Sequence, residues 1–488
     1  MNLMIMFKKL FLVICLLGFY ASNAQDCNAL KALQSVESYM EKNAPSYQND
    51  VIELKREKEY QQFKSKINNI ASQLTAKDSF ECVALVAKYF HFFRDMHLQM
   101  DQKESLTKGL DFKDSSTVFQ YYSKFPTVEN YTIPNKINKK SIEGYWQSEN
   151  GDLAFLIVKY KTPVNEYAAI ALQSDRYYWH KNQIRFEFSH LGNGKYLATR
   201  WNNARNARCF DATLSDSILT IGTHKFFRMK DANTFVDNYK PTYSSKLEFR
   251  ELSALTNYIR IPDFDQTQDQ VDSIVKKYKS LILSKPNLII DIRDNLGGND
   301  DSYYPLLDYI YDTKKIKVPY TMSFYATDEN IAIFEKDIRE SEEFKKDSTR
   351  FLRILSNNRE NRGRFVKPSF GTLKTDTIYP FPNKIAVITN NGCASTAEGF
   401  IMMAKESPRV KIYGTNSAGC FNYGNILFSP VACLPIEIGV PSCKVFFTHP
   451  NYNNLENVGF APDVNLSKFK AGKWVSIVQE NMEKSSSK

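Results

Sequence analysis

The sequence predicts an α/β domain at residues 245–475, preceded by an N-terminal helical region at 25–112 and a small all-β module at 141–232. Three changes in residue pattern along the chain support this division. The first region is rich in Lys, Glu, Gln, Leu and Ala, the second has short strand-like runs between turns, and the third alternates strand-like and helix-like segments. Such alternation is typical of a parallel or mixed sheet with helices on both faces.

The first residues have the pattern of an export signal. A pair of lysines precedes an apolar run at 10–19, and Ala21-Ser22-Asn23-Ala24 offers small residues for cleavage before Gln25. The run is too short to span a bilayer, and no later segment approaches the ~20 apolar residues of a membrane helix. We therefore expect residues 1–24 to be a signal peptide and the mature protein to be secreted or periplasmic, without an integral membrane segment after processing.

Export makes disulfides possible. Two pairings are compatible with the spacing, Cys27 with Cys82 across the helical region and Cys433 with Cys443 across a short hairpin, but the sequence does not fix the connectivity. The sequence has no C-x-x-C pair and no His and Cys at metal-ligand spacing, so we expect no metal site. The net charge of +10 is modest for 488 residues and the basic residues are scattered, which argues against a nucleic-acid partner.

In the helical region, Phe80, Val83, Ala87 and Phe90 recur at helical spacing and predict a helix with one buried face. The all-β module is predicted from strand-like runs with turns such as Asn193-Gly194 between them. These runs are Leu153–Val158, Tyr167–Leu172, Ile184–Phe188 and Ile218–Ile221. They fit a small barrel or a sandwich.

One serine in the α/β region occupies a position suited to a nucleophile. Lys384–Thr389 reads as a buried parallel strand, and apolar residues after Ser395 recur at helical spacing until Pro408. Asn391-Gly392 supplies a tight turn, which would place Ser395 at a helix N-terminus where free N–H groups can stabilise negative charge. The same position also suits an ordinary helix-capping serine.

A second motif, D-x-R-x-N-x-G-G, covers Asp291–Gly298 directly after another buried strand. Two glycines there would let the backbone approach a ligand closely and offer N–H groups to an oxyanion. A strand-end turn with an Asp–Arg ion pair would explain the motif equally well.

Together these segments resemble peptidase family S41, which includes tail-specific C-terminal processing proteases and the tricorn core protease. The resemblance rests on blocks that occur in the expected order across about half of the chain. They are Tyr258–Ile261 with Phe264, Asp291–Gly298, Ala394–Glu398, Gly414-Thr415 and Gly459–Asp463. It implies a ClpP/crotonase-like mixed sheet with helices, and hydrolysis of peptide bonds without a cofactor.

The resemblance also implies site residues. Ser395 matches the nucleophile, and the backbones of Gly297, Gly298 and Thr396 match the oxyanion hole. The processing-protease branch carries a lysine base where this sequence has Cys420, so the Ser–Lys dyad is absent.

The tricorn-like branch uses a histidine in an upstream D-x-H segment, which here is Asp95-Met96-His97. Glu456 matches the glutamate that orients this base. Met96 stands where that branch has a relay serine, so the link from Glu456 to His97 is left open, and Asp95 is a second candidate to orient the imidazole. His449 is the one rival base, since His91 and the histidines of the all-β module are expected to be structural.

The sequence therefore predicts an exported serine peptidase acting on peptides or unfolded proteins. Two alternatives stay open: an inactive binding protein on the same scaffold for peptides or hydrophobic ligands, and a lipocalin-like carrier. The second is suggested by Gly144-Tyr145-Trp146, which resembles the first strand of lipocalin-like barrels. The all-β module replaces the PDZ domain of many family members and has no G-L-G-F-like carboxylate-binding loop.

Overall fold

The protein is described from a computed structural model. Its described residues are 28–484, apart from 76–77, 104–109, 112–113, 134–139, 150, 175–177, 235–242, 266–267, 342–344, 368–372, 376, 450–451 and 453–454. The predicted signal peptide and Cys27 therefore lie outside the described residues.

The described residues fall into two compact units that are discontinuous in sequence. The first unit is drawn from Met1–Phe93, Leu98–Asn238 and Phe428–Val440, and the second from Arg94–His97, Tyr239–Leu427 and Pro441–Lys488. The short stretch Arg94–His97 thus belongs to a different unit from the residues on either side of it.

The first unit begins with helices that share one apolar core. Helix α5 carries the predicted stripe, and Val83, Ala87 and Phe90 on it are buried. The described helices of this unit are α2 (Ala29–Asn43), α3 (Pro45–Tyr47), the π-helix η1 (Gln48–Glu53), α4 (Glu57–Ala71), α5 (Ser79–His91), α7 (Ser115–Tyr122) and the 3-10 turn η2 (Ala232–Thr234). Strand β1 (Gln99–Gln102) pairs antiparallel with the start of β18 (Ile436–Phe447).

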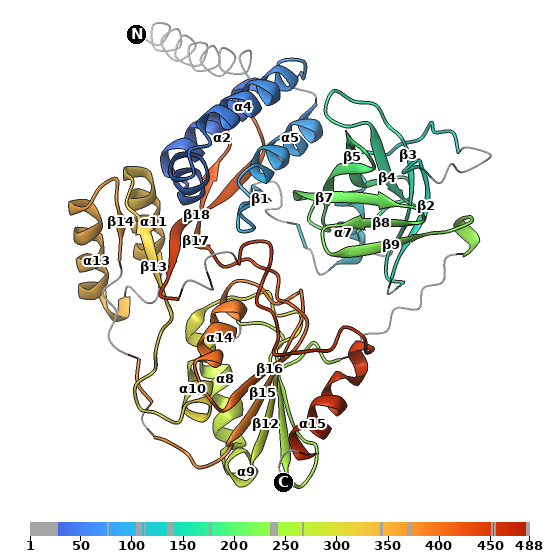
Figure 1. Ribbon diagram of the computed structural model, residues 1–488. Helices are drawn as coiled ribbons and strands as arrows, with labels where there is room; N and C mark the ends of the chain where they lie inside the picture. The colour runs from blue at the N-terminus through green and yellow to red at the C-terminus, as the bar shows by residue number, and fades with distance from the viewer. Residues whose placement is uncertain are drawn as a thin grey trace, which may run out of the picture. The chain divides into compact units, whose positions relative to one another are not determined.

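The rest of the first unit is a closed antiparallel barrel, in which each strand pairs with the next and β9 closes on β2 (Figure 1). Its strands are β2 (Gly144–Ser148), β3 (Ala154–Lys159), β4 (Tyr167–Ala171), β5 (Ile184–Gly192), β6 (Lys195–Trp201), β7 (Ala207–Ser215), β8 (Ile218–Ile221) and β9 (His224–Arg228). The sequence left barrel and sandwich open, and the strands form the barrel.

Large side chains fill the interior of the barrel. Trp146, Phe155 and Phe188 are fully buried in one apolar cluster, and the rings of Phe155 and Phe226 lie 5.0 Å apart. In a small barrel such packing forms the core and takes the space that a carrier would give to its ligand. The packing gives no support to the lipocalin-like carrier hypothesis.

Removing one interior ring should destabilise the first unit. Phe188→Ala would leave a cavity in the barrel core and should lower the free energy of unfolding by about 3–5 kcal/mol, as measured by chemical denaturation. Phe227→Ala is the matched control, because that ring on β9 is 40% exposed, and its effect should stay within about 0.5 kcal/mol. Equal losses in the two variants would contradict a packed interior.

The second unit is built on a sheet in the order β10-β11-β12-β15-β16-β19 (Figure 1). Strand β10 is antiparallel to β11, and the remaining neighbours are parallel. The strands are β10 (Glu248–Glu251), β11 (Thr256–Arg260), β12 (Asn287–Asp291), β15 (Lys384–Thr389), β16 (Val410–Gly414) and β19 (Val464–Asn465). This is the predicted mixed α/β architecture.

Helices cover both faces of this sheet, and neighbouring residues of one strand point to opposite faces. In β12, Leu288 and Ile290 join the core that includes Phe400, whereas Ile289 packs with Trp474 on the other face. The helices are α8 (Gln268–Lys277), α9 (Lys279–Ser284), η3 (Asp300–Tyr303), α10 (Tyr304–Ile310), α14 (Thr396–Lys405), η5 (Ala471–Lys473) and α15 (Trp474–Lys484).

Part of a second, five-stranded sheet belongs to the same unit. Strand β13 (Tyr320–Tyr325) pairs antiparallel with β14 (Phe365–Val366) and with the last residues of β18. β17 (Tyr423–Pro430) pairs with β18. In the chain segment that connects β13 to β14, α11 (Asp328–Glu340) packs against α13 (Ser348–Glu360).

Neither of the two disulfide pairings that the spacing allows is present. Cys82 and Cys443 carry free, buried thiols, so neither Cys27–Cys82 nor Cys433–Cys443 forms, although Cys433 is disulfide-bonded. Spacing along the chain cannot reveal which sulfur atoms meet after folding.

Within the described part of the chain, every helix is too short or too polar to cross a membrane.

Candidate active site

Ser395 lies at the turn between β15 and α14, as the sequence predicts. It is the residue before the first turn of α14, with φ 55° and ψ −123°, a conformation that L-residues seldom adopt outside functional turns. The Ser395 N–H donates to the carbonyl oxygen of Cys420 at 3.0 Å. The side chain is therefore fixed by a strained backbone and is not a simple helix cap, because it makes no capping hydrogen bond to α14.

His97 lies beside this serine, 298 positions away in the sequence. Its Nε2 atom is 3.1 Å from Ser395 Oγ, and its side chain is 7% exposed. A nitrogen at this distance can accept the hydroxyl proton if the ring carries its own hydrogen on Nδ1. Ser395 and His97 thus have the geometry of a nucleophile and its base.

The turn that carries His97 is held by the loop around Glu456. The two carboxylate oxygens of Glu456 accept the backbone N–H groups of Met96 and Asn422, each at 3.0 Å. The Asn457 side chain donates to the carbonyl oxygen of Arg94 at 2.6 Å. Together these bonds attach Arg94–His97 to the second unit.

Glu456 and Asp95 both bind backbone N–H groups of the turn that carries His97. Glu456 binds the backbone on which His97 stands. Asp95 Oδ1 accepts the backbone N–H of His97 at 2.9 Å. Sequence comparison could match the glutamate but could not show that it binds the backbone N–H groups of Met96 and Asn422.

The same buried environment sets the ionisation of Glu456. Burial, with a smaller contribution from the Asp95 carboxylate, raises the pKa of Glu456 from 4.5 to about 8. Folding therefore favours the neutral form of Glu456. The stabilisation that this pKa shift gives to the folded state is complete below pH 4.5 and is lost as the pH rises through about 8.

This shift predicts a pH-dependent stability. The thermal unfolding midpoint of the wild type should fall between about pH 5 and pH 8, by an amount equivalent to at most about 5 kcal/mol at 1.36 kcal/mol per pKa unit. Glu456→Gln should flatten this dependence, since the amide does not ionise. Glu480→Gln on the exposed face of α15 is the control and should leave the slope unchanged. A slope that is identical in all three proteins would contradict the pKa shift.

Glu398 organises the opposite side of the nucleophile. It lies on α14, is fully buried, and accepts the Ser417 hydroxyl at 2.6 Å and the backbone N–H groups of Gly419 and Cys420 at 2.8 and 2.6 Å. Burial raises the pKa of Glu398 although these donors favour its charged form. The Ser-x-x-Glu spacing of the sequence thus fixes the 417–420 loop beside Ser395, a role the sequence did not assign.

The two glycines after β12 approach Ser395 closely. A Cβ atom at Gly297 would lie 2.9 Å from both the Ser395 Cβ and the Thr396 nitrogen. The N–H of Gly297 donates to Asn295 Oδ1 at 2.9 Å, so it is already used. The N–H groups of Gly298 and Thr396 make no hydrogen bond among the described residues. Of the three predicted oxyanion donors, these two remain available.

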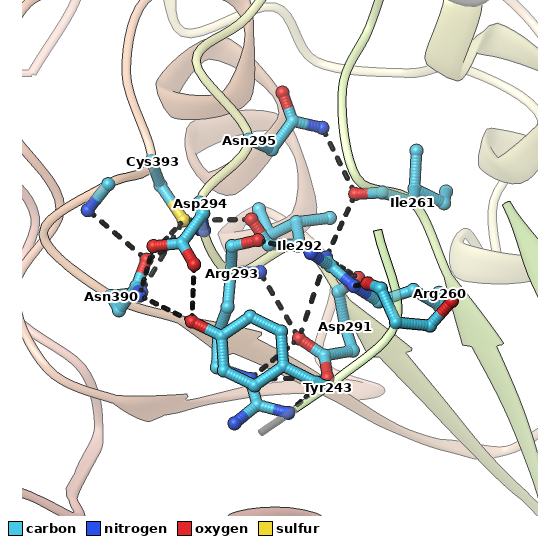
Figure 2. Close-up of polar contacts among 12 residues, drawn as sticks. Tyr243, Arg260, Ile261, Asp291, Ile292, Arg293, Asp294, Asn295, Asn390 and Cys393 are labelled. Carbon is cyan, nitrogen blue, oxygen red and sulfur yellow. Dashed lines mark hydrogen bonds and ion pairs between the residues drawn. The ribbon is translucent and has the colours of Figure 1, made fainter. Parts of the chain in front are cut away.

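A polar network surrounds the residues that lead into this glycine loop (Figure 2). Arg293 donates from Nε and Nη2 to the two carboxylate oxygens of Asp291 at 2.9 and 2.6 Å, and the pair is almost fully buried. Asp294 and Asn390 exchange hydrogen bonds of 2.8 and 2.7 Å, which link the two loops. The Asp–Arg ion pair and the close approach of Gly297 to Ser395 are both present.

Gly298 has no room for a side chain. A Cβ atom there would overlap the backbone of Phe264, and φ is +140°. Gly298→Ala should lower the free energy of unfolding by more than about 3 kcal/mol. Gly363→Ala is the matched control, since Gly363 also has a positive φ but no atom within 4 Å of its Cβ position. It should lose only about 1–2 kcal/mol, and equal losses measured by denaturation would contradict the close approach.

Cys420 completes the surroundings of the imidazole. Its sulfur lies 3.4 Å from His97 Nδ1 and 3.6 Å from Nε2, and its side chain is buried.

His449, the rival base, lies with its ring 5.7 Å from that of Tyr452, and His97 is the histidine in contact with Ser395. His91 is 3.1 Å from Asp211 in the first unit.

The model of peptidase family S41 matches residues 256–466. This range contains Ser395, the glycine loop and Glu456, and leaves His97 outside. No curated protein sequence matches the chain.

Solved structures of similar fold are distant. A structure titled as a possible peptidase from Parabacteroides merdae has 16% identity and a TM-score of 0.30, covering 45% of this chain and 57% of its own. A lipoprotein from Streptococcus agalactiae has 19% identity and a TM-score of 0.30, covering 49% and 70%. Mature CPAF complexed with lactacystin has 12% identity and a TM-score of 0.47, covering 93% and 97%.

Proposed function

Because residues 256–466 belong to peptidase family S41, we propose that the protein is an exported serine peptidase that cleaves peptide bonds through an acyl-enzyme on Ser395, with His97 as general base. The observation that supports this proposal best is the 3.1 Å contact between His97 Nε2 and Ser395 Oγ. It joins a residue inside the matched range to one far upstream of it.

The proposed first step is attack by Ser395 Oγ on the substrate carbonyl carbon. His97 Nε2 takes the hydroxyl proton as the new C–O bond forms, and the imidazolium then returns it to the leaving amine as the C–N bond breaks. A water molecule, deprotonated by the same nitrogen, hydrolyses the resulting ester and frees Ser395.

Negative charge develops on the carbonyl oxygen during both steps. The N–H groups of Gly298 and Thr396 are available, and Thr396 follows Ser395 as the first residue of α14, where the helix dipole also favours an anion. We therefore assign the oxyanion hole to these two residues, with Gly297 as the residue whose lack of a side chain permits the approach.

The proposed base places the protein in the histidine-based branch of the family. Cys420 occupies the position of the lysine in the Ser–Lys branch. Its side chain is a buried thiol beside an imidazole and has no amine group to act as the base of a Ser–Lys dyad. The proposed substrates are peptides or unfolded proteins, and the reaction needs no cofactor. Export is proposed from the N-terminal sequence alone.

A fluorophosphonate probe tests the proposal without knowledge of the substrate, because it reacts with activated serines. The full-length mature protein should be labelled, and the mass of the peptide containing Ser395 should carry the adduct. Ser395→Ala should abolish labelling. His97→Gln should slow it about 10²- to 10⁴-fold, the usual contribution of a general base.

His190→Gln is the matched control, because this histidine is exposed on β5 of the barrel, and its labelling rate should equal that of the wild type. A folded wild type that stays unlabelled would overturn the peptidase proposal and leave the inactive binding protein as the alternative. Labelling that survives in His97→Gln would overturn the assignment of the base.

A further inference from the structure

Cys420 makes two contacts with His97 whose distances define where its sulfur lies. The sulfur is 3.4 Å from Nδ1 and 3.6 Å from Nε2. The N–H bond of an imidazole points away from the opposite ring nitrogen. A linear bond from Nδ1–H would therefore leave the sulfur much further from Nε2 than from Nδ1. Near-equal distances therefore place the sulfur against the face of the ring.

The backbone of Cys420 is tied to the nucleophile on both sides. Its N–H donates to Glu398 Oε2 at 2.6 Å, and its carbonyl oxygen accepts the Ser395 N–H at 3.0 Å. One residue therefore touches the base through its side chain and the nucleophile through its main chain.

We propose that Cys420 is a positioning residue for His97. Its sulfur supports the imidazole by contact and holds Nε2 at hydrogen-bond distance from Ser395 Oγ. This inference rests on the proposed function, since it concerns the same proton transfer. Cys420 takes no proton and forms no bond with the substrate.

Support by contact and support by a hydrogen bond predict different variant series. Cys420→Ser keeps a donor and acceptor but shortens the side chain, whereas Cys420→Val keeps a γ atom of similar reach and removes the polar group. Under contact support, Cys420→Ala and Cys420→Ser should both slow fluorophosphonate labelling about 10- to 100-fold, the expected cost of misplacing a reacting group. Cys420→Val should stay within about threefold of the wild type.

A double-mutant cycle separates positioning from a general structural effect. In a His97→Gln background, Cys420→Ala should change the labelling rate less than about twofold, because the ring it supports is gone. Thermal unfolding of each variant shows that the protein is folded. The Glu398 and Ser395 contacts use only the backbone of Cys420 and are retained in every variant.

Three outcomes would overturn the inference. Full activity in Cys420→Ser with loss in Cys420→Val would assign a hydrogen bond instead of contact. An equal loss with and without His97 would assign a structural role. An unlabelled wild type would overturn the proposed function as well, which distinguishes that failure from the first two, where the wild type is labelled.

Discussion

The hydrogen bonds of the buried Glu456 carboxylate are the interaction on which the site depends. They hold the backbone of Met96 and Asn422, and the turn Arg94–His97 then places an imidazole beside Ser395. A carboxyl group buried in protein loses its hydration, and backbone N–H donors compensate for part of that loss. Glu398 uses the same device on the other side of Ser395. Two buried acids thus position the base and the nucleophile by accepting hydrogen bonds from the backbone N–H groups of the segments around them.

The price of this arrangement is local strain around the nucleophile. Ser395 has a positive φ, and Gly297 and Gly298 adopt conformations that L-residues rarely occupy, with no space for a side chain. Such strain persists only where surrounding bonds over-determine the backbone. The buried Asp291–Arg293 pair, below the glycine loop, supplies this rigidity. Buried interactions around Ser395 therefore serve to maintain the strained backbone geometry of the site.

Much of the site could be predicted from the sequence because its motifs are local. A strand, a small-residue turn and a helix fix the position of Ser395, and two glycines after a strand indicate a close backbone approach. Other features depend on the folded chain. The use of the Gly297 N–H by Asn295 and the backbone role of Glu456 follow from contacts that no spacing encodes. The disulfide pairing and the membership of Arg94–His97 in the second unit likewise depend on contacts of the folded chain.

The central claim is that this turn is firmly held where it presents His97 to Ser395. Amide hydrogen exchange of the full-length protein tests it directly, because a bonded, buried N–H exchanges only when its segment opens. The account predicts that the Met96 amide is strongly protected in the wild type and loses that protection in Glu456→Ala, while amides within α14 keep theirs. Exchange of the wild-type Met96 amide at the rate of an unfolded peptide would contradict the account.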